Sequence, residues 1–165
     1  MDRKEEYNEI AERMIGHVQN DTTDQAKDIL SVPTSDYTCE KRWKLEIDKI
    51  FKELPLMLAL SIEIPNKGDY KSIEIAGIPV LITRDKDKKV HAFRNVCSHR
   101  GALLAKEEIG NKNKFTCPYH GWTYSNQGEL IGVLENNKFG EFDKSCNGLQ
   151  ALPCEEFGGM VFVIL

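Results

Sequence analysis

The chain has 165 residues, 41% of them apolar, and a net charge of −4 at pH 7. Its acidic and basic residues are interleaved, so it lacks the basic stripe that a nucleic-acid backbone requires. The uninterrupted apolar stretches, such as Leu56 to Leu60, are far shorter than the roughly 20 residues that a membrane-spanning helix needs. We therefore expect a globular protein that binds neither nucleic acid nor membrane.

The first residues, 1 to 6, are mostly charged and precede no apolar segment, so no secretory signal is expected. This predicts a cytoplasmic, reducing location. Five cysteines are an odd number for such a chain, and a disulfide framework is the weaker interpretation. Three of them, Cys39, Cys146 and Cys154, are expected to be plain buried or partly buried thiols.

Residues 1–54 are expected to form a helical arm. The first helix carries an apolar stripe made of Tyr7, Ile10, Met14, Ile15 and Val18. Thr22 and Gln25 suggest a capping box for a short helix that ends near Leu30. Thr38 can cap a further helix, which Pro55 stops. The apolar stripes either pack on the rest of the domain or, in the sharper alternative, the first helix docks on a partner subunit.

Residues 55–165 are expected to form an antiparallel β domain, because short apolar segments there alternate with turn residues. A hairpin is predicted around Ala76-Gly77, and Asn126-Gln127-Gly128 supplies a second turn. Further strands are predicted at residues 90–94, 115–116, 122–125, 129–133 and 159–165.

Two short motifs combine cysteine with histidine, Cys97-Ser98-His99 and Cys117-Pro118-Tyr119-His120. Each motif places one thiolate and one imidazole in a tight loop, and together they form a ligand set for a metal centre. Gly101 and Gly121 follow the histidines, where glycine lets the backbone fold back so that amide groups can point at sulfur.

Zinc and an iron–sulfur cluster compete for this ligand set. Structural zinc sites commonly pair cysteine with cysteine and histidine with histidine in their spacing. Here each loop contributes one of each. A Rieske centre has thiolates on one iron and imidazoles on the other, which two mixed loops can deliver. The spacing therefore favours iron–sulfur, and a structural zinc module stays as an alternative.

Residues 95–102 and 117–122 resemble the cluster motifs of Rieske proteins, specifically those of ring-hydroxylating oxygenase α subunits. The resemblance extends from about Pro33 to Leu165, and the segments that carry it outside the motifs are Ile64–Tyr70, Ile78–Asp85 and Gly158–Val163. It implies a mainly β fold, an antiparallel β-sandwich or barrel of the Rieske type. A cluster-binding subdomain at about residues 93–130 and an N-terminal helical arm would belong to it.

The resemblance also implies the roles of the site residues. Cys97 and Cys117 would bind one iron of a [2Fe-2S] cluster, and His99 and His120 the other. His120 would be the exit for electrons, and the loop surface around His99, Arg100 and Trp122 the docking face for an electron donor.

The kind of Rieske centre follows from three neighbouring positions. Respiratory-type domains carry a disulfide between the loops and a serine hydroxyl near the cluster, whereas Ala102, Tyr119 and Trp122 stand at those positions here. Fewer donors to the cluster predict a reduction potential at the low end of the range, near roughly −150 mV. Such a centre accepts electrons from a ferredoxin or a flavin reductase.

The family's catalytic site also needs a mononuclear iron held by two histidines and a carboxylate. Only His17 and His91 remain outside the two motifs, and the sequence ends where the catalytic domain of the family would begin. We therefore expect no catalytic residues in this chain, which would pass electrons to the mononuclear-iron domain as a fragment or truncated frame of an α subunit. A stand-alone Rieske ferredoxin is the alternative. The resemblance also allows a homo-oligomer.

Overall fold

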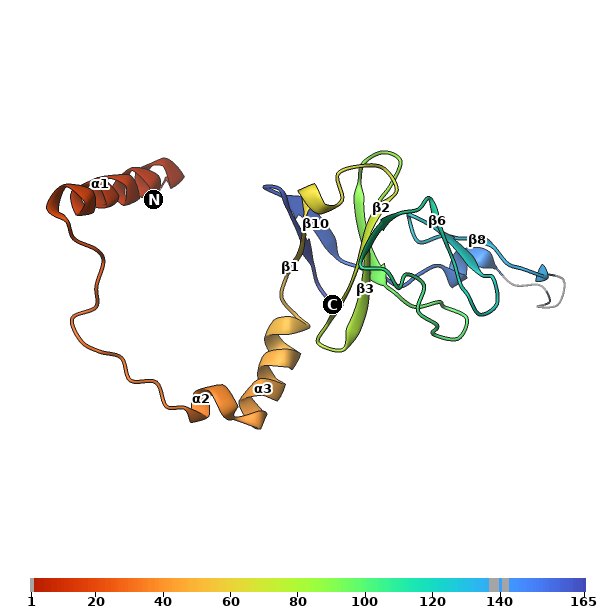
Figure 1. Cartoon of the computed structure of the whole chain (residues 1–165), viewed down its shortest axis with the longest axis horizontal. Coiled ribbons are helices and arrows are strands. Elements are labelled where there is room, and N and C mark those ends of the chain that lie inside the picture. Colours follow the sequence, from red (N-terminus) through yellow and green to blue (C-terminus); the bar gives the residue numbers. More distant parts are fainter. Residues whose placement is uncertain (1, 137–139, 141–142) are drawn as a thin grey trace. The chain divides into compact units, whose positions relative to one another are not determined.

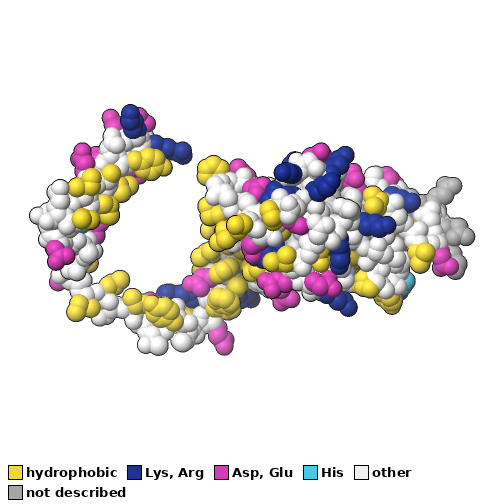
Figure 2. All heavy atoms as spheres, turned by 45° about the horizontal axis from the view of Figure 1, so that its top comes forward, with side chains coloured by type: hydrophobic (Ala, Val, Ile, Leu, Met, Phe, Trp, Pro, Cys, Tyr) yellow, Lys and Arg dark blue, Asp and Glu magenta, His cyan; other side chains and the backbone are white. Residues whose placement is uncertain are grey.

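The computed structural model describes residues 2–136, 140 and 143–165 (Figure 1). The chain divides into two compact units, one up to Cys39 and one from Glu40 to Leu165. The first contains α1 (Arg3–Asn20) and α2 (Ser35–Thr38). Asp2 and Glu5 form a capping box at the start of α1. No residue of α1 is buried, and its apolar side chains are visible along the helix in Figure 2. Among the described helices, none has the length and apolarity to cross a membrane.

The short helix predicted to end near Leu30 is wrong, since residues 22–30 contain no helix. Asp21 ends α1 in the left-handed conformation, and the backbone amide of Thr22 donates to the carbonyl of His17. The side chains of Thr22 and Asp24 each lie 2.9 Å from a ring nitrogen of His17. Thr22, one of the two residues that suggested a new helix, instead closes the C-terminal end of the previous one.

The second unit opens with α3 (Glu40–Glu46) and the π-helical turn η1 (Ile47–Phe51), which confirms the helix predicted before Pro55. The rings of Trp43 and Phe51 lie 6.1 Å apart across it. The predicted cap by Thr38 is wrong, because Thr38 is the last residue of α2 and α3 begins two residues later, at Glu40. The Thr38 hydroxyl donates to the carbonyl of Thr34, the residue before α2.

Three antiparallel sheets make up the rest of the unit (Figure 1). The largest has the strand order β5-β2-β3-β4-β9, and the smaller two have the orders β1-β11-β10 and β6-β7-β8. The strands are β1 (Leu56–Leu60), β2 (Asp69–Ile75), β3 (Ile78–Arg84), β4 (Val90–Arg94), β5 (Ile109–Asn111), β6 (Lys114–Thr116), β7 (Thr123–Ser125), β8 (Leu130–Gly132), β9 (Ala151–Leu152), β10 (Cys154–Phe157) and β11 (Met160–Val163). The 3₁₀ turns η2 (Ser61–Glu63) and η4 (Lys144–Asn147) lie between strands.

The hairpin predicted around Ala76-Gly77 is confirmed, with pairing from Tyr70 opposite Thr83 to Ile75 opposite Ile78. Ala76 and Gly77 both have positive φ, as a two-residue hairpin turn of the favoured twist requires. The other predicted strands are also present, but β5, β9 and β10 are additional. Short edge strands such as these carry too few residues to show a period of two.

The core consists of two clusters of buried side chains. One packs β1 and β11 against the large sheet and includes Val80, Ile82 and Val161. The other lies beneath the cysteine-containing loops and includes Phe93, Trp122 and Tyr124. The two cysteines Cys97 and Cys117 are part of this second cluster, so the candidate metal centre is built on the core.

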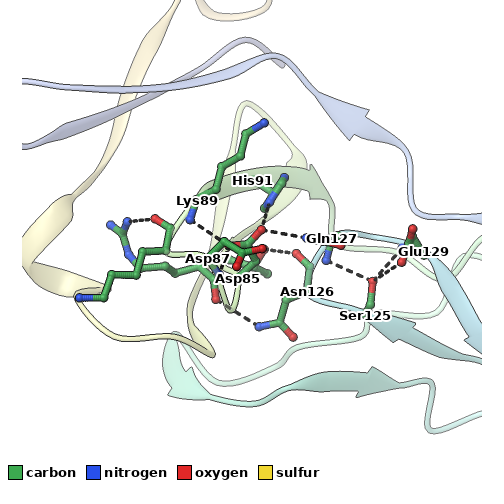
Figure 3. Close-up of polar contacts among 11 residues, drawn as sticks. Asp85, Asp87, Lys89, His91, Ser125, Asn126, Gln127 and Glu129 are labelled. Atoms are coloured by element: carbon green, nitrogen blue, oxygen red, sulfur yellow. Dashed lines mark hydrogen bonds and ion pairs between the residues drawn. The ribbon is translucent and has the colours of Figure 1, made fainter.

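A network of hydrogen bonds around buried Asp85 fastens the β7–β8 turn to the large sheet (Figure 3). Its carboxylate accepts from the side chain of Gln127 at 3.0 Å and contacts the ring of His91 at 2.9 Å. It also accepts from the backbone amides of Asp87 and Lys89. These bonds connect the β7–β8 turn, and with it the small sheet β6-β7-β8 that flanks the second cysteine motif, to the large sheet.

Candidate metal centre

The two cysteine-containing loops have the same backbone frame. In the first, the amide of Cys97 donates to the carbonyl of Ala102, and the amide of Gly101 donates to the carbonyl of Cys97. In the second, Cys117 donates to Trp122 and Gly121 donates back to Cys117. Gly101 and Gly121 have φ values of 71° and 68°, a conformation that favours glycine. The sharp return expected from the two glycines is therefore present in both loops.

The four candidate ligands come together from these loops as two pairs. The thiols of Cys97 and Cys117 are 2% and 3% exposed and interact with each other. The rings of His99 and His120 pack edge to face with centroids 4.7 Å apart. Within the described part of the chain, no group of three or more His, Cys, Asp or Glu side chains gathers as one ion would require. Two thiols beside two imidazoles is the arrangement of a centre with two irons.

One atom of this site is available for a ligand. The Nδ1 atom of His120 is buried and has no hydrogen-bond partner among the described residues. A buried ring nitrogen without a partner costs free energy, because it has lost its contact with water. Coordination to a metal would satisfy it, so the residues present fit a metal–sulfur group.

Two ionisable groups of the site have shifted pKa values. Burial, followed by the nearby His120 and Arg100, lowers the pKa of His99, which favours its uncharged ring. Burial raises the pKa of the Cys97 thiol, and the neighbouring Cys117 raises it further, against hydrogen bonds from Tyr124 and the His99 amide. A neutral imidazole is ready to bind metal, whereas a thiol must lose its proton to do so.

Comparison with known proteins agrees with this geometry. The model of the Rieske [2Fe-2S] domain matches residues 55–152. The chain belongs to the Rieske [2Fe-2S] domain family. Its cofactor is therefore a Rieske-type [2Fe-2S] cluster, and the zinc alternative loses its support.

The curated relatives are oxygenase subunits. The anthranilate 1,2-dioxygenase large subunit of Acinetobacter baylyi is 36% identical over 130 residues, which are 78% of this chain and 28% of that protein. The glycine betaine monooxygenase oxygenase subunit of Chromohalobacter salexigens is 36% identical over 136 residues, 82% of this chain and 30% of that protein. The chain thus spans less than a third of the length of these relatives.

Solved structures show the same fold. Naphthalene 1,2-dioxygenase from a Rhodococcus species, bound to indole, superposes with a TM-score of 0.75 at 32% identity, covering 80% of this chain and 31% of that one. A quaternary ammonium Rieske monooxygenase in its apo form gives a TM-score of 0.73 at 34% identity, covering 81% and 39%. The expected mainly β Rieske fold is confirmed.

The other two residues of the predicted docking face, Arg100 and Trp122, differ in their exposure. Arg100 is exposed, whereas Trp122 is only 5% exposed and stacks on His99 with centroids 4.9 Å apart. Trp122 therefore packs against the His99 ring and exposes little surface that a partner could contact. Tyr119, which was not predicted to belong to the docking face, is 62% exposed and lies beside His120.

One further residue of the site, Tyr124, was not found from the sequence. The hydroxyl of Tyr124 lies 3.2 Å from Sγ of Cys97 and 2.8 Å from Oγ of Ser98. The signal that could have found Tyr124 is its place on β7, because alternation along this strand turns it towards the buried Cys97. It adds a donor near the sulfur that the comparison with respiratory-type domains did not count.

The remaining cysteines and histidines lie outside the site. Cys39 and Cys146 are exposed, which corrects the expectation that they are buried, and Cys154 is half-buried as expected. Cys39 is the C-cap of α2 and Cys146 lies in η4, and neither of these short elements has a buried residue. His17 closes the end of α1, and His91 contacts Asp85 on the large sheet.

Proposed function

We propose that this chain transfers single electrons through a [2Fe-2S] cluster bound by Cys97 and Cys117 on one iron and by His99 and His120 on the other. The observation that carries the proposal is the convergence of two thiols and two imidazoles, with the buried Nδ1 of His120 left for a ligand. When bound, the cluster supplies a one-electron redox centre of tunable potential.

The residues of this chain would serve that transfer in different ways. The buried cysteines sit inside the core, which excludes water from the sulfur side of the site. The histidines lie nearer the surface, and His99 is held between the rings of His120 and Trp122. The imidazole side is therefore the side through which electrons would enter and leave, with Arg100 and Tyr119 exposed around it for contact with a partner.

We further infer that the chain works as the Rieske part of an oxygenase α subunit. It would receive electrons from a reductase or a ferredoxin and pass them through His120 to a mononuclear-iron domain. Support comes from the curated relatives, which are dioxygenase and monooxygenase subunits of which the chain spans 28% and 30%. The predicted domain boundary, with an arm at residues 1–54 and the Rieske domain at 55–165, belongs to the same proposal.

Metal analysis and spectroscopy of anaerobically purified protein test the cluster assignment. We expect two irons and two sulfides per chain, visible absorption, and the rhombic electron paramagnetic resonance signal of a reduced Rieske centre. One zinc without sulfide would contradict the proposal.

The ligand assignment needs a matched pair of variants. His120→Ala is expected to abolish the Rieske signal, because one iron loses a ligand. His17→Ala removes a histidine from the other unit of the chain and is expected to leave the signal unchanged. A retained signal in His120→Ala would overturn the assignment of that residue. The electron path is tested by adding a separately produced mononuclear-iron domain to the reduced protein and following reoxidation of the cluster.

A further inference from the structure

Four polar groups form a continuous chain beside the candidate cluster site. The hydroxyl of Tyr124 contacts Sγ of Cys97 at 3.2 Å and Oγ of Ser98 at 2.8 Å. The Ser98 hydroxyl in turn donates to the backbone carbonyl of Asn147 at 2.7 Å. The amide of Ser98 also donates to the Tyr124 oxygen at 3.1 Å. Tyr124 is fully buried, so water does not reach its hydroxyl, whereas Ser98 is exposed.

The number of protons available for this chain depends on the state of Cys97. A thiol, a phenol and a serine hydroxyl supply three protons for the three contacts between the sulfur, the two hydroxyls and the carbonyl. All bonds can then point one way, from sulfur to Tyr124, from Tyr124 to Ser98, and from Ser98 to Asn147. Each group is satisfied in the metal-free protein.

Binding to iron removes one of these protons, since the metal ligand is the thiolate. Two protons then remain for three contacts. The sulfur and the Asn147 carbonyl can only accept hydrogen bonds. They therefore compete for the two protons that remain, those of the Tyr124 and Ser98 hydroxyls. While Ser98 donates to the carbonyl, its own oxygen is free to accept the Tyr124 proton, and that proton is drawn away from the sulfur.

We propose that Ser98 is a positioning residue that divides the Tyr124 proton between the Cys97 sulfur and the chain leading to the Asn147 carbonyl, and that it thereby lowers the reduction potential of the cluster. This rests on the proposed function, because it requires Cys97 to be an iron ligand. Hydrogen bonds to sulfur stabilise the reduced, more negative cluster and raise its potential. A residue that weakens such a bond has the opposite effect.

Removal of the Ser98 hydroxyl and removal of the Tyr124 hydroxyl are expected to shift the reduction potential in opposite directions. Ser98→Ala removes the competing acceptor, so Tyr124 donates to the sulfur alone and the potential becomes more positive. Tyr124→Phe removes the donor, and the potential becomes more negative. In the double variant no Tyr124 proton is left for residue 98 to influence. The reduction potential of the double variant is therefore expected to equal that of Tyr124→Phe.

The experiment is a redox titration of the four purified proteins, monitored by visible circular dichroism, with iron and sulfide measured on each. We expect Ser98→Ala to change the one-electron equilibrium by about tenfold, which corresponds to 59 mV. Ser98→Thr keeps a hydroxyl and is expected to retain the wild-type potential. If the alanine variant loses its cluster, Ser98→Gly removes the same hydroxyl and gives the same test.

The outcomes separate this inference from the proposed function. A wild-type protein without iron and sulfide would show that the proposed function has failed. A normal cluster content with an unchanged or more negative potential in the serine variants would overturn the role of Ser98 alone. Additive shifts in the double variant would do the same, because they would show that Ser98 acts independently of Tyr124.

Discussion

The first cysteine loop, Cys97–Ala102, and the second, Cys117–Trp122, share one backbone frame but lie in different surroundings. Each has the same pair of backbone hydrogen bonds and a glycine of positive φ four residues after its cysteine. The first loop contacts Tyr124 through its sulfur, whereas the second packs its glycine against Leu134. The frame is thus a property of each loop, and the environment of each sulfur is a property of the fold.

The largest effect is expected from loss of a cysteine ligand, and it should be the same for both loops. Cys97→Ser and Cys117→Ser are each expected to abolish the cluster, because each removes a thiolate from the same iron. Iron and sulfide content and the visible spectrum measure this. Cys146→Ser is the matched control, an exposed cysteine outside both loops, and is expected to keep full cluster content. Survival of the cluster in either loop variant would show that the loops are not equivalent as ligand donors.

The glycines of the two loops are expected to differ. Alanine at either position is strained by the positive φ, at a cost of about 1–2 kcal/mol. At Gly121 the added Cβ would also lie 2.8 Å from Cβ of Leu134, whereas no described atom lies within 4 Å at Gly101. Overpacking costs roughly a further 1–3 kcal/mol. Urea unfolding should therefore show Gly121→Ala to be less stable than Gly101→Ala, and equal stabilities would contradict this view of the second loop.

Asp85, which is 3% exposed, accepts the hydrogen bond that holds the β7–β8 turn to the large sheet. Replacing Asp85 should weaken this contact. Asp85→Asn replaces an accepting oxygen by a donor opposite His91 and Gln127, and we expect a loss of about 1–3 kcal/mol at pH 7. The measurement is the free energy of unfolding in urea.

The same variant predicts a pH dependence. Burial alone would raise the pKa of the Asp85 carboxyl, but hydrogen bonds from Gln127, His91 and the backbone amides of Lys89 and Asp87 outweigh it and lower the pKa below 3.8. A carboxyl whose pKa is lowered by folding stabilises the protein above its unfolded pKa and loses this contribution as the pH falls towards its folded pKa. The difference between wild type and Asp85→Asn should therefore narrow below about pH 4. A constant difference would count against an ionised Asp85.

The smallest effect is expected on the exposed stripe of α1, which belongs to the other unit of the chain. Val18 is 84% exposed, so Val18→Ser is expected to change the free energy of unfolding by less than about 0.5 kcal/mol. A larger loss that depends on protein concentration would indicate that this helix docks on a partner, the sharper of the two alternatives for the stripe.

The sequence by itself determined the local features, because each depends on residues close together in the chain. The spacing of cysteine, histidine and glycine specified both loops, and Ala76-Gly77 specified the β2–β3 hairpin. Local polar residues were also the source of the one wrong helix, at residues 22–30. There the side chain of Thr22 could cap a following helix or contact the preceding one, and it contacts His17 of α1.

Only the tertiary structure decided what surrounds each ligand. Tyr124 reaches Cys97 across 27 positions of sequence, and Gln127 reaches Asp85 across 42. The acceptor at the end of the hydroxyl chain is the backbone carbonyl of Asn147, a group that every residue carries and that no residue type can reveal. The motifs therefore indicate which atoms can bind the cluster, while the hydrogen bonds proposed to set its potential arise from packing between distant segments.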